Sequence, residues 1–92
     1  MGADAADAEA WVYLLRCGDG SLYTGWTTDL ERRLARHRAG TASRYTASRL
    51  PIALELALPM DSRTAARREE VRIKRLSRRA KLALVGERGR DG

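Results

Sequence analysis

The chain of 92 residues contains no phenylalanine, only two prolines and a single cysteine. Without phenylalanine, the core must be built from aliphatic side chains, with two tryptophans and three tyrosines as its only large rings. The single cysteine, Cys17, excludes an internal disulfide and has no second thiolate with which to form a zinc site. We interpret it as a small apolar strand residue of a protein in a reducing compartment.

Long apolar runs are also missing, and none approaches the ~20 residues that a membrane-spanning helix needs. Residues 1–10 carry three acids and no base, unlike the basic and then apolar start of a signal peptide. These features predict a cytoplasmic protein with no membrane partner. The length predicts one domain with a modest core, and the 43% hydrophobic content argues against a wholly disordered chain.

Acidic residues are scarce in the body of the chain, although the first ten residues are acidic. The net charge is +6, and residues 11–85 hold 16 Lys and Arg against 7 Asp and Glu. A compact domain with this surplus attracts polyanions, and nucleic acid is the commonest polyanion in a cytoplasm. The charge therefore favours a nucleic-acid partner over a surface that is basic merely for solubility.

The first half of the chain predicts a hairpin followed by a helix. Residues 11–17 and 21–26 are rich in strand formers and flank a Gly-Asp-Gly turn, which is typical of two paired strands. Thr28 and Glu31 have the spacing of a capping box at a helix start. Gly40 is expected to end that helix.

The second half predicts a polar loop over residues 40–50 and a third strand over residues 51–59, which two prolines frame. Glu55 is expected on an exposed face of that strand. Asp61 is expected to cap the next helix, which ends near Leu76.

Ser77 is expected to cap a last short helix that Gly86 stops. The order of elements predicts an α/β fold in which helices cover a small, at least partly antiparallel sheet. We expect a flexible acidic tail over residues 1–10, one domain over residues 11–85 and a flexible end over residues 86–92.

A few polar residues along this framework suit the hydrolysis of a phosphodiester bond, which needs an activated water, a cation near the nonbridging oxygens and help for the leaving group. An arginine can stabilise the developing charge, and one carboxylate can hold Mg²⁺ together with several waters. A tyrosine can act as the base if arginine and metal favour its phenolate, because its free pKa is about 10. The candidates are Tyr13, Tyr23, Arg33, His37 and Glu70.

The order and spacing of these residues resemble the motifs of the GIY-YIG nuclease superfamily, in particular its stand-alone bacterial GIY-YIG domain proteins. Each short motif is a weak signal, but together they extend the likeness over about residues 11–85. The matching positions are Val12 with Tyr13, Tyr23 with Thr24 and Gly25, Arg33 with His37, and Glu70.

The resemblance implies a GIY-YIG domain, with a small three-stranded antiparallel sheet flanked by three helices, and a metal-dependent endonuclease acting on DNA. It implies that Tyr13, assisted by Tyr23, positions or activates the water. Arg33 would stabilise the transition state, and His37 would help the proton transfer. Glu70 would hold one Mg²⁺ or Mn²⁺ ion.

We further expect four residues to lie at a nucleic-acid interface. Gly25 would let the backbone come close to the site. Arg44, Tyr45 and Thr46 give a loop that is basic, aromatic and polar, which suits phosphate contacts as well as it suits a solvated surface. The expected partner is DNA, with branched or damaged DNA as candidate forms, bound by a monomer or weak homodimer. Its specificity would be weak or guided by structure, because the sequence shows no separate DNA-reading motif.

Two departures from the family pattern matter. Trp11 stands where the first motif has glycine, which is tolerable because the chemistry needs the tyrosine. Glu69 adjoins Glu70, and adjacent helical residues point about 100° apart, so only one of them can face the site. The resemblance favours Glu70, because Ile73 follows it by three residues, where the family pattern has an apolar residue, and Glu69 is the alternative.

Each candidate also has a purely structural explanation. Tyr13 and Tyr23 could be a cross-strand aromatic pair, and His37 could favour the dipole at a helix C-terminus. Two other functions therefore stay open. One is a non-catalytic nucleic-acid-binding module, for DNA or RNA, that retains the fold. The other is a protein-interaction domain whose basic face meets an acidic partner.

Overall fold

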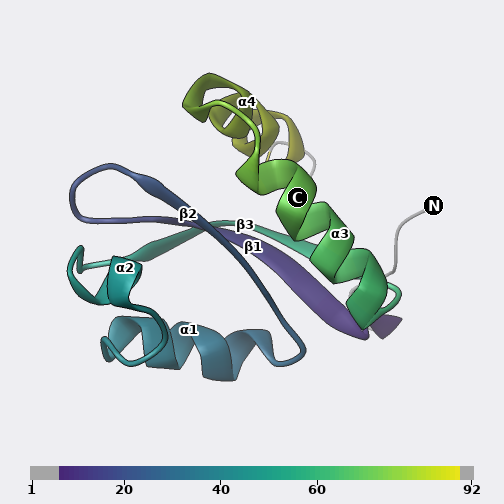
Figure 1. Cartoon of the computed structure of the whole chain (residues 1–92), viewed down its shortest axis with the longest axis horizontal. Coiled ribbons are helices and arrows are strands. Elements are labelled where there is room, and N and C mark those ends of the chain that lie inside the picture. The colour runs from purple at the N-terminus through teal and green to yellow at the C-terminus, as the bar shows by residue number, and fades with distance from the viewer. Residues whose placement is uncertain (1–6, 90–92) are drawn as a thin grey trace.

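Three antiparallel strands form one sheet in the computed structural model, which describes residues 7–89 (Figure 1). The central strand is β1 (Ala10–Arg16), with β2 (Leu22–Thr27) on one side and β3 (Ala53–Met60) on the other. The predicted hairpin is therefore present as β1 and β2. The α/β fold with a three-stranded antiparallel sheet is confirmed.

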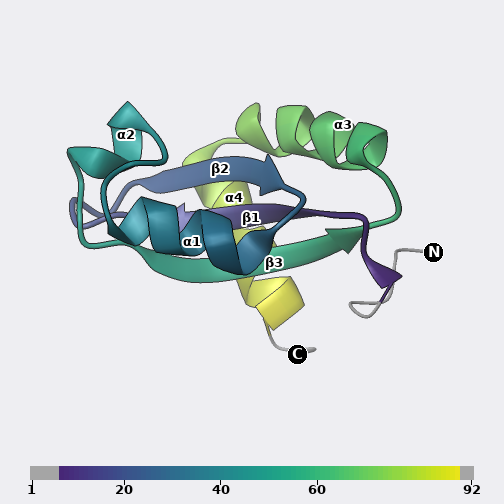
Figure 2. The same cartoon turned by 90° about the horizontal axis from the view of Figure 1, so that it is seen from below.

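Four helices accompany the sheet: α1 (Leu30–Arg38), α2 (Arg44–Ala47), α3 (Arg63–Lys74) and α4 (Arg78–Gly89). Figure 2 shows α1 in front of the sheet and α4 behind it. Both faces of the sheet are thus covered, and α2 is an addition to the three predicted helices. Among the described residues, no helix combines the length and the apolar character needed to cross a bilayer.

The alternation of side chains along β1 divides the core into two parts. Val12 and Leu14 pack into a cluster with residues of β3 and α3, and side chains of α4 lie against it. Tyr13 and Leu15 point to the opposite face and pack with Leu34 of α1. Because successive residues of a strand point to opposite faces, Tyr13 is carried to the face that α1 covers.

The start of α1 is set one residue later than predicted. The Asp29 side chain caps the helix by accepting a hydrogen bond from the Arg32 amide at 3.1 Å. The Thr27 hydroxyl accepts from the Asp29 amide at 3.1 Å, which fixes the chain where it enters the helix. The predicted cap Thr28 is wrong, because Asp29 has the extended backbone that a cap requires.

The caps of the later helices are partly as predicted. Ser62, rather than Asp61, caps α3 by accepting from the Ala65 amide at 3.0 Å. Ser77 accepts from an amide in the first turn of α4, as expected. Gly86 does not stop α4, which continues to Gly89. A helical glycine costs only about 1 kcal/mol, and side chains just before it pack on the core.

The domain begins earlier than predicted. Ala10 belongs to β1 and is fully buried. The Glu9 amide donates to the Met60 carbonyl at 2.9 Å, so pairing with β3 already starts inside the predicted tail. Of the two predicted flexible ends, residues 1–6 and 90–92 lie outside the described residues.

Two polar segments are more ordered than predicted. The loop over residues 40–50 contains α2, which Ser43 caps by accepting from the Thr46 amide at 3.1 Å. Glu55 does not stand free on an open face, because it accepts a hydrogen bond from the Arg16 side chain at 2.6 Å. Both corrections involve partners that no periodic sequence pattern reveals.

Candidate active site

A buried hydrogen bond joins the central strand to the first helix. The Tyr13 hydroxyl lies 2.8 Å from His37 Nε2, and each residue is only 1% exposed. His37 follows Leu34 by three residues on α1, so both face the sheet. The sequence prediction that Tyr13 and His37 belong to one site is therefore matched by direct contact.

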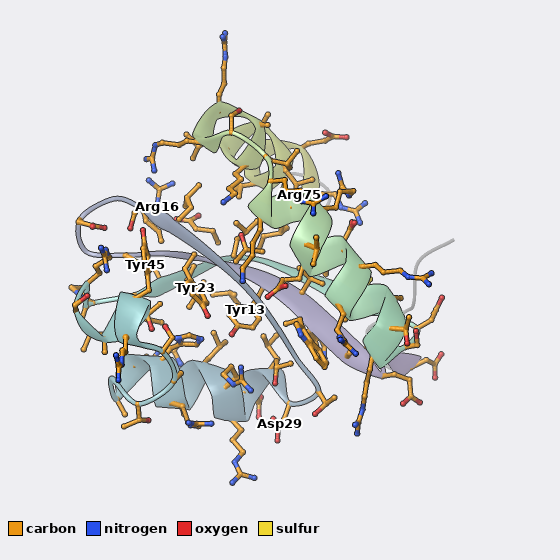
Figure 3. The ribbon with its side chains drawn as sticks, viewed as in Figure 1. Tyr13, Arg16, Tyr23, Asp29, Tyr45 and Arg75 are labelled. Carbon is orange, nitrogen blue, oxygen red and sulfur yellow. The ribbon has the colours of Figure 1, made fainter. Side chains whose placement is uncertain are left out.

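Tyr23 reaches the same place from β2. It pairs with Leu15 and so points to the same face of the sheet as Tyr13. Its ring centroid lies 6.5 Å from that of Tyr13 and 5.3 Å from that of His37. Figure 3 shows the tyrosine side chains on the side of the sheet that faces α1. Two tyrosines and one histidine therefore share one cluster.

Gly25 creates the space for this cluster. It is the cross-strand partner of Tyr13, and a Cβ atom on Gly25 would lie 2.5 Å from the Tyr13 hydroxyl. Real Cβ atoms essentially never come this close to another heavy atom. The close approach predicted at Gly25 is thus made by Tyr13 of the same chain, rather than left open for a nucleic-acid backbone.

The electrostatics around Tyr13 keep its hydroxyl neutral. Burial raises the pKa of Tyr13 to about 12, and the neighbouring Tyr23 and Glu70 add to the rise. The Arg33 guanidinium lies beside the hydroxyl and lowers its pKa. The expected influence of Arg33 toward phenolate is therefore right in sign, but desolvation outweighs it.

Burial shifts the pKa of His37 in the opposite direction from that of Tyr13. Burial lowers the pKa of His37 below 6.5, and the positive charges of Arg33 and Arg36 lower it further. The imidazole is consequently neutral at neutral pH, so one ring nitrogen carries a proton and the other can accept one. A neutral imidazole thus lies against a neutral tyrosine hydroxyl.

The structure distinguishes the two adjacent glutamates of α3. Glu69 is held by Arg72 through two hydrogen bonds of 2.6 and 3.0 Å. The Glu70 side chain is only 16% exposed and pairs with Lys74 at 3.3 Å. Glu70 also lies close enough to Tyr13 to raise its pKa. Glu70, rather than Glu69, is the carboxylate whose charge acts on Tyr13.

One carboxylate of this kind fits a Mg²⁺ ion that keeps most of its waters. Within residues 7–89, no group of three or more His, Cys, Asp or Glu side chains is placed to hold a metal. A fully protein-built metal cage is thus not formed by this part of the chain. Glu70 remains the candidate ligand, with Lys74 as a competing partner on its solvent side.

Two hollows of about 230 and 290 Å³ adjoin Arg33. They share Thr27, Thr28 and Arg33, and the larger one is also lined by Trp26 and Arg63. The sequence offers many arginines in α3 and α4 without distinguishing them. The structure singles out Arg63, because it lies on the same hollow as the candidate catalytic arginine.

The residues predicted for nucleic-acid contact fall into two groups. Tyr45 is 39% exposed and stacks on Tyr23 with ring centroids 5.8 Å apart, extending the row of rings seen in Figure 3. Arg44 is exposed beside it. Thr46 is fully buried and binds His37, so the prediction that it contacts a phosphate is wrong. Sequence reasoning also missed Arg49, whose guanidinium lies 3.8 Å from the Tyr45 ring centre.

Comparison with known proteins agrees with this geometry. Residues 9–83 match the GIY-YIG catalytic domain family, and this segment carries β1, β2, α1 and the glutamate of α3. The chain belongs to the GIY-YIG family.

Relatives within the GIY-YIG family are of similar length to this chain. A UPF0213 protein of Streptococcus sanguinis is 48% identical over 80 residues, which cover 87% of this chain and 92% of the relative. A UPF0213 protein of Halobacterium salinarum is 49% identical over 73 residues, covering 79% and 95%. The likeness thus spans almost the whole of each relative.

Solved structures show the same GIY-YIG fold. The solution NMR structure of a UPF0213 protein from Bacillus halodurans is 44% identical, with a TM-score of 0.59, and the match covers 87% of this chain and 85% of that one. The solution NMR structure of a protein from E. faecalis is 32% identical, with a TM-score of 0.55 and coverage of 91% and 88%. Trp11, which stands in place of the motif glycine, does not prevent the fold.

Proposed function

We propose that this GIY-YIG protein is a metal-dependent endonuclease that hydrolyses phosphodiester bonds in DNA. The observation that carries the proposal is the convergence of three side chains on the Tyr13 hydroxyl. Tyr13 is hydrogen-bonded to His37, and its pKa responds to both Arg33 and Glu70. A base, its proton acceptor, a cation and a metal-binding carboxylate are the groups that this hydrolysis needs.

Tyr13 would work as the middle of a proton relay. A pKa of about 12 disfavours a free phenolate, so the two proton transfers would occur together. The attacking water gives its proton to the Tyr13 oxygen while the Tyr13 proton passes to Nε2 of neutral His37. Tyr23, packed against both rings, keeps water away from the far side of the pair. A positioned base typically contributes about 10²–10⁴-fold to the rate.

Arg33 and Glu70 would act on the phosphate. The half-buried Arg33 guanidinium can donate hydrogen bonds to nonbridging oxygens as their charge grows. Glu70 would hold one Mg²⁺ or Mn²⁺, which when bound withdraws charge from those oxygens and lowers the pKa of bound water. The low exposure of the Glu70 side chain keeps that carboxylate fixed relative to Tyr13.

The surroundings suit a nucleic-acid chain passing over this site. Arg63 and Trp26 lie on the hollow next to Arg33, and exposed Tyr45 extends the aromatic row on the other side. Arginines can bind backbone phosphates and aromatic rings can stack on bases. These contacts read shape and charge more than sequence, so we propose weak or structure-guided specificity, with branched or damaged DNA as candidate substrates and a monomer or weak homodimer as the acting form.

The test is cleavage of labelled duplex, single-stranded, forked and four-way-junction DNA with Mg²⁺ or Mn²⁺. Glu70→Ala should abolish metal-dependent cleavage, and Glu69→Ala is the matched control that should retain it. Loss of the Glu69 ion pair affects mainly stability, by about 0–1 kcal/mol for such exposed pairs. Equal activity in wild type and Glu70→Ala would refute the proposal. Tight, metal-independent binding without cleavage would support the nucleic-acid-binding module instead.

A further inference from the structure

We propose that Thr46 and Ser43 of the α2 segment hold His37 in the tautomer with its proton on Nδ1. Nε2 is thereby left free to accept the Tyr13 proton. The catalytic meaning of this tautomer rests on the proposed nuclease function, but the tautomer itself is a property of the free protein. Thr46 and Ser43 are positioning residues, because they act through His37.

The residues form a continuous hydrogen-bonded chain. His37 Nδ1 lies 2.8 Å from the Thr46 hydroxyl oxygen, and that oxygen lies 2.8 Å from the Ser43 hydroxyl. Tyr13 completes the other end at 2.8 Å from Nε2. Thr46 is 0% exposed, so water does not compete for its hydroxyl. Three short contacts therefore link β1, α1 and α2 through one imidazole ring.

The Tyr13 end of the chain determines where its hydroxyl proton goes. The Arg33 guanidinium beside the hydroxyl has donors only and cannot accept that proton. His37 Nε2, at 2.8 Å from the hydroxyl oxygen, can accept that proton when it carries none itself. A proton on Nε2 would leave two donors facing the Tyr13 oxygen and its own proton without an acceptor. The tyrosine thus favours an unprotonated Nε2.

If Nε2 is unprotonated, Nδ1 carries the proton and needs an acceptor, which the Thr46 hydroxyl at the α2 end of the hydrogen-bonded chain can supply. The Ser43 oxygen accepts the Thr46 amide at 3.1 Å as the helix cap, which leaves the Ser43 proton free for the Thr46 oxygen. The Thr46 proton can point to the Ser43 carbonyl at 3.4 Å. The Thr46 oxygen can then accept from His37 Nδ1 as well. Every donor has an acceptor in this arrangement, as buried polar groups require.

This arrangement gives α2 a role in catalysis, although the helix has only four residues. A histidine cannot accept a proton at a nitrogen that already carries one, and the partner of the other nitrogen decides which one that is. If Thr46 failed to accept from Nδ1, part of the protein would carry the proton on Nε2. That fraction could not take the Tyr13 proton. The inference predicts a defect in turnover rather than in DNA binding.

The direct experiment is NMR of the ring nitrogens in ¹⁵N-labelled protein at neutral pH, without DNA or metal. His37 is the only histidine of the chain, so its ring signals need no further assignment. We expect Nδ1 to show the shift of a protonated nitrogen and Nε2 that of an unprotonated one. The reverse pattern, or a proton shared equally between the two nitrogens, would overturn the inference without any variant.

Two variants then test the role of Thr46. Thr46→Val removes the hydroxyl at nearly constant shape, whereas Thr46→Ser retains it. Thr46→Val should lower the Nδ1-protonated fraction and reduce kcat by about 10²-fold, the lower end of the contribution of a positioned base, with little change in KM. Thr46→Ser should restore both. An unchanged tautomer in folded Thr46→Val protein would overturn the role of Thr46.

The outcomes separate this inference from the proposed nuclease. The predicted tautomer in a protein that cuts no DNA would refute the nuclease and leave the tautomer assignment standing. DNA cleavage by a protein whose His37 proton is on Nε2 would refute the tautomer assignment and leave the nuclease proposal standing. If Thr46→Val does not fold, as judged by its amide spectrum, the wild-type measurement and Thr46→Ala decide.

Discussion

The Tyr13 hydroxyl occupies the space that a side chain at Gly25 would need. The two residues are cross-strand partners, and a Cβ on Gly25 would come within 2.5 Å of the hydroxyl oxygen and 2.6 Å of the ring carbon that bears it. The ring cannot give way easily, because its hydroxyl is fixed by His37 at 2.8 Å. The glycine of the second motif is therefore needed to leave room for the tyrosine of the first motif.

Gly25→Ala should therefore displace the Tyr13 hydroxyl from His37. We expect cleavage to fall by about 10²-fold or more, because the relay is broken, and stability to fall by about 1–3 kcal/mol, the usual cost of overpacking. Cleavage rates and urea unfolding measure the two effects. Gly86→Ala is the control, since a Cβ there meets open space and a helical alanine is stabilising. Full activity in Gly25→Ala would contradict this account.

The buried, neutral His37 should make stability depend on pH in a defined window. Its pKa is lowered below 6.5 in the folded protein, so the unfolded chain binds more protons just below that pH. The free energy of unfolding should thus be constant above about pH 6.5 and fall as the pH decreases toward the folded-state pKa, by at most about 1.4 kcal/mol per pH unit. Urea unfolding at a series of pH values measures the slope.

The control for this slope is His37→Gln, which should be less stable but show no such loss between about pH 5 and 6.5. The carboxylates of Asp19 and Glu69, whose pKa values are lowered from 3.8 and 4.5, contribute only at lower pH. The groups facing His37 are Arg33 and Arg36 of α1 together with Tyr13 and Tyr23. An equal slope in wild type and His37→Gln would show that groups other than His37 cause the pH dependence of stability.

Much of this site follows from local sequence patterns. Strand alternation places Tyr13 inward, and helical spacing places His37 on the buried face of α1 after Leu34. Helix geometry also showed that only one of Glu69 and Glu70 can face the site, whereas the preference for Glu70 came from the family pattern. These features depend on residues within one element, which is why a sequence can reveal them.

The rest depends on contacts between elements. Thr46 lies in a segment of four helical residues, too short for a hydrophobic period, so its burial against His37 could not be predicted. The neutral state of Tyr13 results from burial by the whole domain, which outweighs the visible arginine. Arg63 is distinguished from Arg67 and Arg68 by the hollow that it lines. Such properties appear only when the chain is folded.

Arg63 offers a test of the substrate path. Arg63→Ala should weaken DNA binding uniformly across sequences. The slope of log binding constant against log salt concentration should fall by about one, as for the loss of one phosphate contact. KM should rise, with little change in kcat. Arg67→Ala is the matched control, because it removes the same charge from the same helix but lines a different hollow. Equal effects of the two variants on binding and salt dependence would show that only the net charge matters.

The last prediction concerns stability away from the site. Thr24 is 2% exposed, and its hydroxyl is the only buried side-chain polar atom in residues 7–89 that lacks a hydrogen-bond partner. An unpaired buried hydroxyl costs roughly 1–3 kcal/mol, and valine has the same shape without it. Thr24→Val should therefore raise the free energy of unfolding by about 1 kcal/mol or more. Thr27→Val is the contrast, because its hydroxyl binds the Asp29 amide, and it should lower stability. Urea unfolding of both variants decides, and a destabilised Thr24→Val would mean that the Thr24 hydroxyl has a partner after all.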